Sequence, residues 1–370
     1  MKPVLKQISE ENDVLRFTLA DINVSFANAI RRIILDEIPT IVLGTDIYKD
    51  NSCSITVNTG RLHNELVKQR LSSIPVHISS EKEMESFPKQ YILEINLQNN
   101  TETMMIVTTE DFKIKEKESG KYMAKEEVRQ IFPPNPITNS FIDFIRLRPK
   151  IGDSIPGEQI RLTCEFTIGK ASQNGMYNVV SKCAYGNTPD LIAVDAKWEE
   201  IRQRMIAEND SKEEIEFQKK NYYLLDAQRQ FVPNSFDFVI QTIGVFENKV
   251  IIQKACSILQ KKMVDMIQRL ESDVVPISLS ETTMENSYDI VLENEDYTIG
   301  KVIEYILYEK FYMGEEIMSF CGFKKYHPHD TDSKIRVAYK LPTDKYMVRQ
   351  HLKTACLDAA EVFTTVYKMW

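Results

Sequence analysis

Apolar residues recur at helical spacing in residues 25–40, which read SFANAIRRIILDEIPT. At about 100° per residue, one stripe of apolar side chains forms, and this spacing predicts an amphipathic helix that faces a core. Ser25 is placed to cap the helix and Pro39 to end it. The predicted inner stripe consists of Phe26, Ala29, Ile30, Ile33 and Ile34.

Two adjacent arginines, Arg31 and Arg32, lie on the opposite side of this helix. A solvated basic face is the commoner explanation for charged residues on one side of a helix. Arginine around an apolar anchor such as Leu35 is, however, typical of protein interfaces. We predict a docking face for a second protein, formed by Asn28, Arg31, Arg32 and Leu35.

The same pattern returns in residues 297–311, YTIGKVIEYILYEKF. With a constant offset, Thr298 takes the capping position that Ser25 takes in the first helix. The outward positions differ in chemistry from those of the first helix, as expected if each helix meets a different external partner. The inner positions are Ile299, Val302, Ile303, Ile306 and Leu307, and the outward positions are Lys301, Glu304, Tyr305 and Tyr308.

The flanks of the two helices also correspond. Extended segments precede them at 14–21 and 288–296, and each is followed later by a strand-like and then a long helical segment (235–246 with 249–270, and 333–341 with 344–370). Any two amphipathic helices share a stripe, so coincidence is the alternative. The shared order favours an internal duplication whose inner faces pair.

Composition and charge narrow the class of protein. The chain has 370 residues, 43% hydrophobic and 27% charged, which is apolar enough for a packed core and long enough for about two domains. The formal net charge of -8 argues against an unaided nucleic-acid clamp. The first residues, MKPVLKQISEEND, lack a signal peptide's apolar segment, and no apolar run approaches the ~20 residues of a membrane span. We expect an intracellular protein without a membrane partner.

The sequence patterns that would indicate a catalytic or metal-binding site are weak. The six cysteines are widely spaced, which is typical of a reduced protein without zinc or a disulfide framework. Glycine-rich phosphate loops and a D-x-D-G-D-like cluster are missing. His327 and His329 lie in YHPHD, where a turn at Pro328 is favoured over a metal site. Cys183 and Cys321 have no neighbour in sequence that would activate a thiol. We predict no catalytic residue, metal or cofactor.

Several segments resemble a known family. FANAIRRIILDEIPT is similar to the signature helix of the alpha-type assembly subunits of multisubunit RNA polymerase. These are the bacterial alpha subunit, the archaeal D subunit and the third-largest subunit of polymerase II. Residues 64–78 resemble the second family motif, although Gln69 stands where histidine is common and Ser72 and Ser73 replace the usual Gly-Leu. Residues 145–166 resemble the family's return strand, and 169–190 the loop after it.

The last third of the chain resembles the family's small partner, the archaeal L subunit or the eleventh subunit of polymerase II. The matching segments are ENEDYTIGKVI and SFCGFKKYHPHDTDSKIRV. The resemblance implies a natural fusion of the two subunits. A fusion of this kind suits a large nucleocytoplasmic DNA virus, and the sequence, rich in Asn, Ile and Lys, is compatible with such a source.

The resemblance implies an α+β fold in which two fused dimerisation units form an intramolecular pseudo-dimer. The first unit would comprise residues 1–46 and 145–275, interrupted by an inserted α/β domain at 47–144, and the second residues 276–370. The insert carries only Cys53, so the family's four-cysteine zinc loop should be absent. The densely charged segment 199–220 is predicted to be an exposed helix with i, i+4 pairs.

The implied function is a non-catalytic assembly platform for the two largest subunits of a DNA-dependent RNA polymerase. Small polymerase subunits are further candidate partners, and DNA would be met only through the complex. A separate dimerisation partner is not expected. The implied location is the cytoplasm of an infected cell or the virion for a viral protein, and otherwise the nucleus. Two alternatives remain: a self-dimerising scaffold, and an unrelated enzyme with a site in the insert.

Overall fold

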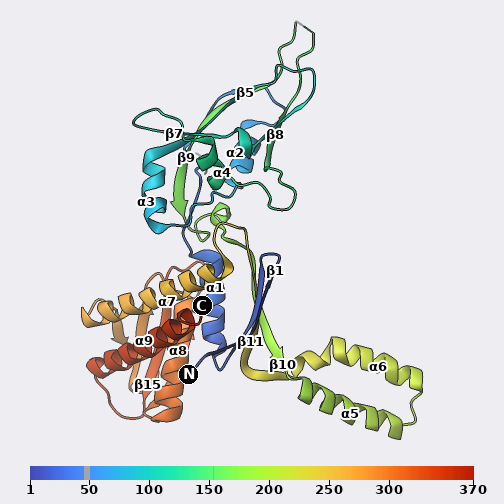
Figure 1. The fold of residues 1–370 in the computed structure, drawn as a ribbon. Coiled ribbons are helices and arrows are strands. Elements are labelled where there is room, and N and C mark those ends of the chain that lie inside the picture. Colours follow the sequence, from blue (N-terminus) through green and yellow to red (C-terminus); the bar gives the residue numbers. More distant parts are fainter. Residues whose placement is uncertain (46–50, 153) are drawn as a thin grey trace. The chain divides into compact units, whose positions relative to one another are not determined.

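The computed structural model describes residues 1–45, 51–152 and 154–370 (Figure 1). Its contacts divide the chain into a larger unit, residues 1–33, 182–241 and 252–370, and a smaller unit, residues 34–181 and 242–251. The boundaries implied by the family resemblance stay a prediction, and the one at residues 46–47 falls outside the described residues.

The first sheet of the larger unit has four strands in the order β1-β2-β11-β10. The central strands β2 and β11 pair antiparallel, with Phe17 opposite Phe238. The strands predicted at 14–21 and 235–246 are therefore confirmed, and the second begins earlier than its pattern indicates. The bounds are β1 Val4–Glu11, β2 Val14–Ala20, β10 Val180–Pro189 and β11 Phe231–Thr242.

The second sheet repeats this arrangement in the order β12-β13-β15-β14. Again the strand before the amphipathic helix pairs antiparallel with the strand before the long helix, with Ile290 opposite Ile335. The strands predicted at 288–296 and 333–341 are confirmed. The bounds are β12 Ile277–Leu279, β13 Ser287–Leu292, β14 Met318–Lys324 and β15 Ser333–Tyr339.

Each sheet has one amphipathic helix and one long helix. We call the first sheet with α1 and α7 the first repeat, and the second sheet with α8 and α9 the second repeat. All ten predicted inner side chains of α1 and α8 are at most 6% exposed, because each helix turns its apolar stripe to a core. The bounds are α1 Val24–Asp36, α7 Asn248–Glu271, α8 Tyr297–Leu307, followed by a π-helical segment Tyr308–Gly314, and α9 Lys345–Tyr367.

The predicted helix caps are wrong by two residues. The side chain of Asn23, rather than Ser25, accepts a hydrogen bond at the start of α1, from the Ser25 amide at 2.9 Å. The Ser25 hydroxyl is buried and has no hydrogen-bond partner among the described residues. In α8 the cap is Asp296, which accepts from the Thr298 amide at 2.9 Å. The correct caps obey the same offset as the predicted ones, so the correspondence between the helices extends to their first turns.

The charged segment forms a helical hairpin and not one helix. Helices α5 (Leu191–Ala207) and α6 (Lys212–Leu224) are separated by a turn in which Asn209 has a φ of 60° (Figure 1). The hairpin is not solvated on all sides, because it encloses a small core of its own. That core consists of Val194, Trp198, Tyr222 and Ala227.

The smaller unit is built on antiparallel strands in the order β3-β9-β5-β7, with β4 also paired to β9. A two-stranded sheet, β6 with β8, accompanies it. The predicted return strand is thus two strands, β8 and β9, and the predicted loop 169–190 contains β10. The bounds are β3 Thr40–Leu43, β4 Cys53–Asn58, β5 Tyr91–Gln98, β6 Met105–Thr108, β7 Lys113–Glu116, β8 Asp143–Leu147, β9 Gln159–Gly169, α2 Asn64–Ser72, α3 Glu81–Gln90 and α4 Lys125–Ile131, with 3-10 turns at Thr109–Asp111, Gly175–Tyr177 and Asp226–Arg229.

Gly300 of α8 gives a first testable prediction. A Cβ added there would lie 1.9 Å from the ring of Phe323, whereas the corresponding residue of α1 is a buried alanine, Ala27. Gly300→Ala is expected to lower the free energy of unfolding by about 1–2 kcal/mol, because overpacking outweighs the gain in helix propensity. Urea unfolding measures the change. In a Phe323→Leu background the loss should shrink, and a Gly300→Ala variant as stable as the wild type would contradict the argument.

Candidate functional site

Aromatic side chains join the two repeats inside the larger unit. The ring of Phe26 from α1 lies 5.2 Å from that of Phe363 in α9 and 6.3 Å from that of Tyr305 in α8. Phe17 of β2 meets Trp370 edge to face at 4.9 Å. Edge-to-face contacts between buried rings stabilise beyond the area they bury. The inner stripe of α1 is thus covered in part by side chains of the second repeat.

A charged contact crosses the same boundary. The guanidinium of Arg32 forms a close ion pair with the carboxylate of Asp296, and their side chains are only 28% and 31% exposed. Burial alone would raise the pKa of Asp296, but hydrogen bonds from Thr298 and the charge of Arg32 hold it below its usual range. Arg32 does not simply leave the core as predicted. Its position lies about 60° from Ala29 around the helix, so a long side chain can reach the second repeat.

The contact between Arg32 and Asp296 has a counterpart in which the two amphipathic helices exchange roles. Under the offset that relates the two helices, Tyr305 corresponds to Arg32 and Asn23 corresponds to Asp296. Tyr305 and Asn23 line one small surface pocket. The same position of each amphipathic helix therefore lies near the cap of the other, which is the reciprocal relation that a two-fold axis produces. The two contacts are nevertheless chemically different. Arg32 and Asp296 form an ion pair, whereas Tyr305 and Asn23 are both uncharged side chains.

Further ion pairs follow the long helices. Lys262 of α7 pairs with Glu295 at 3.1 Å, and Lys353 of α9 pairs with Glu271 at the end of α7 at 2.5 Å. The pair between Lys353 and Glu271 is partly exposed, and surface pairs of this kind contribute little stability each. The pair between Lys262 and Glu295 is more buried, with side chains 22% and 18% exposed.

The outer face of α1 holds one positioned arginine. The side-chain oxygen of Asn28 accepts from Nε and Nη2 of Arg31, at 3.1 and 2.8 Å. Burial raises the pKa of the Cys183 thiol in β10 to about 12, although the nearby positive charge of Arg31 opposes this rise. Asn28, Arg31 and Leu35 are all half-buried. A docking role for this face stays a prediction.

The outward side of α8 is occupied in part by its own repeat. Glu304 pairs with Lys301 at 2.6 Å and accepts a hydrogen bond from the Phe323 amide of β14 at 2.9 Å. Tyr308 stacks on Tyr312 with 4.8 Å between ring centroids. Lys301 and Tyr308 remain exposed, and a docking role for this second face also stays a prediction.

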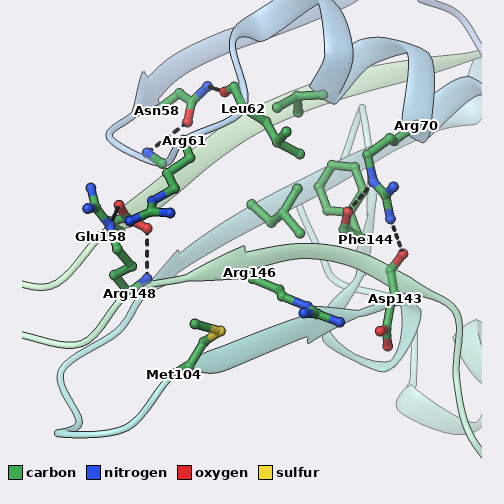
Figure 2. Close-up of a pocket in the computed structure, with 13 residues that line it drawn as sticks. Asn58, Arg61, Leu62, Arg70, Met104, Asp143, Phe144, Arg146, Arg148 and Glu158 are labelled. Atoms are coloured by element: carbon green, nitrogen blue, oxygen red, sulfur yellow. Dashed lines mark hydrogen bonds and ion pairs between the residues drawn. The ribbon is translucent and has the colours of Figure 1, made fainter.

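The sequence reasoning missed a pocket in the smaller unit (Figure 2). Its volume is about 490 Å³, and four arginines line it together with apolar residues. One signal was available: in the segment 145–148, IRLR, strand-like alternation predicts both arginines on one side of the chain, and Leu147, the last residue of β8, is fully buried. The four arginines are Arg61, Arg70, Arg146 and Arg148.

Other candidate chemistry fits structural roles. His327 to Asp330 form a turn closed by a hydrogen bond from the Asp330 amide to the His327 carbonyl, at 3.1 Å. Burial raises the pKa of Cys321 to about 12, so this thiol, like Cys183, is protonated and a weak nucleophile near neutral pH. Within the described ranges, His, Cys, Asp and Glu side chains do not gather in threes that could hold a metal ion. Helices in these ranges are too short or too polar to span a bilayer.

Comparison with known proteins identifies the class. The family model for the RNA polymerase Rpb3/Rpb11 dimerisation domain matches residues 16–263, more than half of the chain. The chain therefore belongs to this family of polymerase dimerisation proteins.

Individual relatives share shorter segments. DNA-directed RNA polymerases IV and V subunit 3B of Arabidopsis thaliana is 35% identical over 82 residues, which are 22% of this chain and 23% of that protein. A putative DNA directed RNA polymerase subunit of Acanthamoeba polyphaga mimivirus is 30% identical over 112 residues, 30% of this chain and 28% of that protein. DNA-directed RNA polymerase subunit Rpo3 of Pyrococcus furiosus is 34% identical over 70 residues, 19% and 24% respectively. The chain thus matches less than a third of the length of each relative.

The ion pair between the repeats can be measured by a double-mutant cycle. Asp296→Asn keeps a good helix cap and removes the charge, and Arg32→Met removes the guanidinium. We expect a coupling energy of about 1 kcal/mol in urea unfolding, because both side chains are more than two-thirds buried. Effects that simply add within about 0.3 kcal/mol would show that the pair contributes nothing to holding the repeats together.

Proposed function

We propose that this protein is a non-catalytic assembly-platform subunit of a multisubunit DNA-dependent RNA polymerase, on which the two large catalytic subunits dock. The observation that carries the proposal is the family match over residues 16–263, which includes most of β2, all of α1 and most of α7. The names of the three relatives also describe polymerase subunits. In this proposal the chemistry belongs to other chains, and DNA is met only through the complex.

The second part of the proposal is that the two repeats form an intramolecular pseudo-dimer, with the second repeat in the place of a separate small partner subunit. The equal strand order of the two sheets supports this. So do the reciprocal positions of Arg32 near Asp296 and of Tyr305 near Asn23. Because both repeats belong to one chain, they pair at a high effective concentration.

The chemical difference between these two contacts favours internal pairing over a self-dimerising scaffold. Two copies of the first repeat would set Arg32 against Asn23, which offers no carboxylate. The ion pair forms only between unlike repeats, and a charge that loses its partner on burial disfavours the wrong pairing.

The family resemblance suggests which partner meets each docking face. We assign the second-largest subunit to the face of α1 that carries Arg31, and the largest subunit to the side of the second repeat that exposes Lys301 and Tyr308. Arg31 is suited to docking because Asn28 holds its guanidinium in place before any partner arrives. For a viral protein the site of action would be the cytoplasm of an infected cell or the virion, and a mimivirus relative is compatible with that source.

Capture of the tagged full chain from its native source tests the platform function. We expect two very large chains at one copy each. Arg31→Glu should abolish their recovery, because it reverses the charge of the docking face without touching the pair between Arg32 and Asp296. A matched control is Arg229→Glu, which changes an 82% exposed arginine beside the hairpin. Equal recovery with both variants, each folded by circular dichroism, would refute the docking face, and capture of the chain alone would refute the platform.

The molecular mass of the purified chain tests internal pairing. A monomer is expected in analytical ultracentrifugation over a wide range of concentration, because in the proposed pseudo-dimer the second repeat takes the place of a partner chain. A dimer whose dissociation depends on concentration would instead favour the self-dimerising scaffold.

A further inference from the structure

The arginine-lined pocket of the smaller unit lies on residues that neither docking face uses. In Figure 2, Arg61 and Arg148 lie at one end of the pocket and Arg70 at the other. The loop that carries Arg61 is held in shape by Asn58, whose amide group donates to the Leu62 carbonyl at 2.8 Å and accepts from the Gly60 amide at 3.1 Å. The arginines are therefore presented on an ordered frame.

Arg70 is positioned without being neutralised by the groups that hold it. Its Nε donates to the backbone carbonyl of Phe144 at 2.6 Å, and its Nη2 donates to the backbone carbonyl of Asp143 at 2.9 Å. Both acceptors are uncharged. A guanidinium held in this way keeps its positive charge for a ligand and loses little side-chain freedom when the ligand binds.

Arg148 differs from the other arginines because a buried carboxylate balances it. Glu158 is only 7% exposed, pairs with the guanidinium of Arg148 and accepts a hydrogen bond from its backbone amide at 2.7 Å. Arg61 and Arg146, in contrast, have no ion-pair partner among the described residues, and both are exposed. The lining contains four arginines and two carboxylates, Asp143 and Glu158, so it carries an excess of positive charge. The whole chain, in contrast, has a net charge of -8.

The floor between the arginines is apolar. Val67 and Phe144 are fully buried beneath it, and Met104, with 57% of its surface exposed, offers a flexible apolar side chain at the rim. Leu62 and Ile145 complete the apolar lining. Arginine around an apolar and aromatic centre is the composition of protein-binding hot spots.

We propose that this pocket binds an extended acidic segment of another protein, in which carboxylates flank a bulky apolar residue. The apolar residue would cover the floor, and the carboxylates would pair with Arg61, Arg146 and Arg70, whose planar forks match carboxylate geometry. A nucleic-acid backbone fits less well, because its phosphates and sugars carry no bulky apolar group to cover the floor. This inference goes beyond the platform function and needs no large subunit.

Selection from a random library of displayed peptides tests the proposal with the purified full chain. We expect enrichment of peptides in which Asp or Glu flanks Phe, Leu or Met. Synthetic, fluorescein-labelled copies should bind with an anisotropy change, and replacing the apolar residue by Gly should weaken binding about tenfold or more. Arg61→Glu combined with Arg146→Glu should weaken binding by a similar or larger factor.

The matched control is Arg161→Glu, which changes an exposed arginine of β9 in the same unit that does not line the pocket. It should leave peptide binding unchanged. Arg61→Gln with Arg146→Gln offers a milder pair should the double reversal unfold the chain. Selection of peptides without acidic residues, or equal binding by the double variant and the wild type, would overturn the proposal. So would a labelled oligo(dT) that binds through Arg61 and Arg146 while acidic peptides do not. None of these outcomes depends on capture of large subunits, so the pocket and the platform can fail separately.

Discussion

Burial of the apolar stripes of α1 and α8 is the interaction on which the larger unit depends. Both helices are short, with 13 and 11 residues, and helices of that length are marginal in water on their own. Each therefore owes its stability to the side chains that cover its apolar stripe. Phe26 illustrates this dependence, since its fully buried ring contacts side chains of α8 and α9.

In the proposed pseudo-dimer, polar contacts at the edge of this apolar layer determine how the repeats are matched. An apolar stripe alone specifies its partner poorly, because many apolar surfaces of similar width would pack against it. The pair between Arg32 and Asp296 has one geometry and one pair of partners. In this proposal, specificity comes from a few side chains at the edge of the core, while most of the stabilisation comes from the core itself.

Local periodicity predicted a large part of the fold, and contacts distant in sequence account for the rest. The stripes of α1 and α8 and the two long helices follow from spacing, which needs only neighbouring residues. The caps were misplaced because Asn23 and Ser25 are both good capping residues two positions apart, and periodicity cannot choose between them. The break between α5 and α6 lies at a turn where Asn209 has a positive φ, and the densely charged pattern around it does not mark that position. The arginine-lined pocket gathers residues from several segments between Asn58 and Glu158, so no local window contains it.

The two helix caps carry an evolutionary consequence. Asn23 and Asp296 are nearly equivalent as caps, so either residue can stand at either position at little cost to the start of the helix. They differ in charge, and in the genetic code an asparagine codon becomes an aspartate codon by one change at its first base. A duplicated pair of repeats with asparagine at both caps could therefore acquire one aspartate by a point mutation that leaves both helices intact. That change alone would make the two halves of a symmetric ancestor chemically different. Each half would then be free to diverge toward a different neighbour.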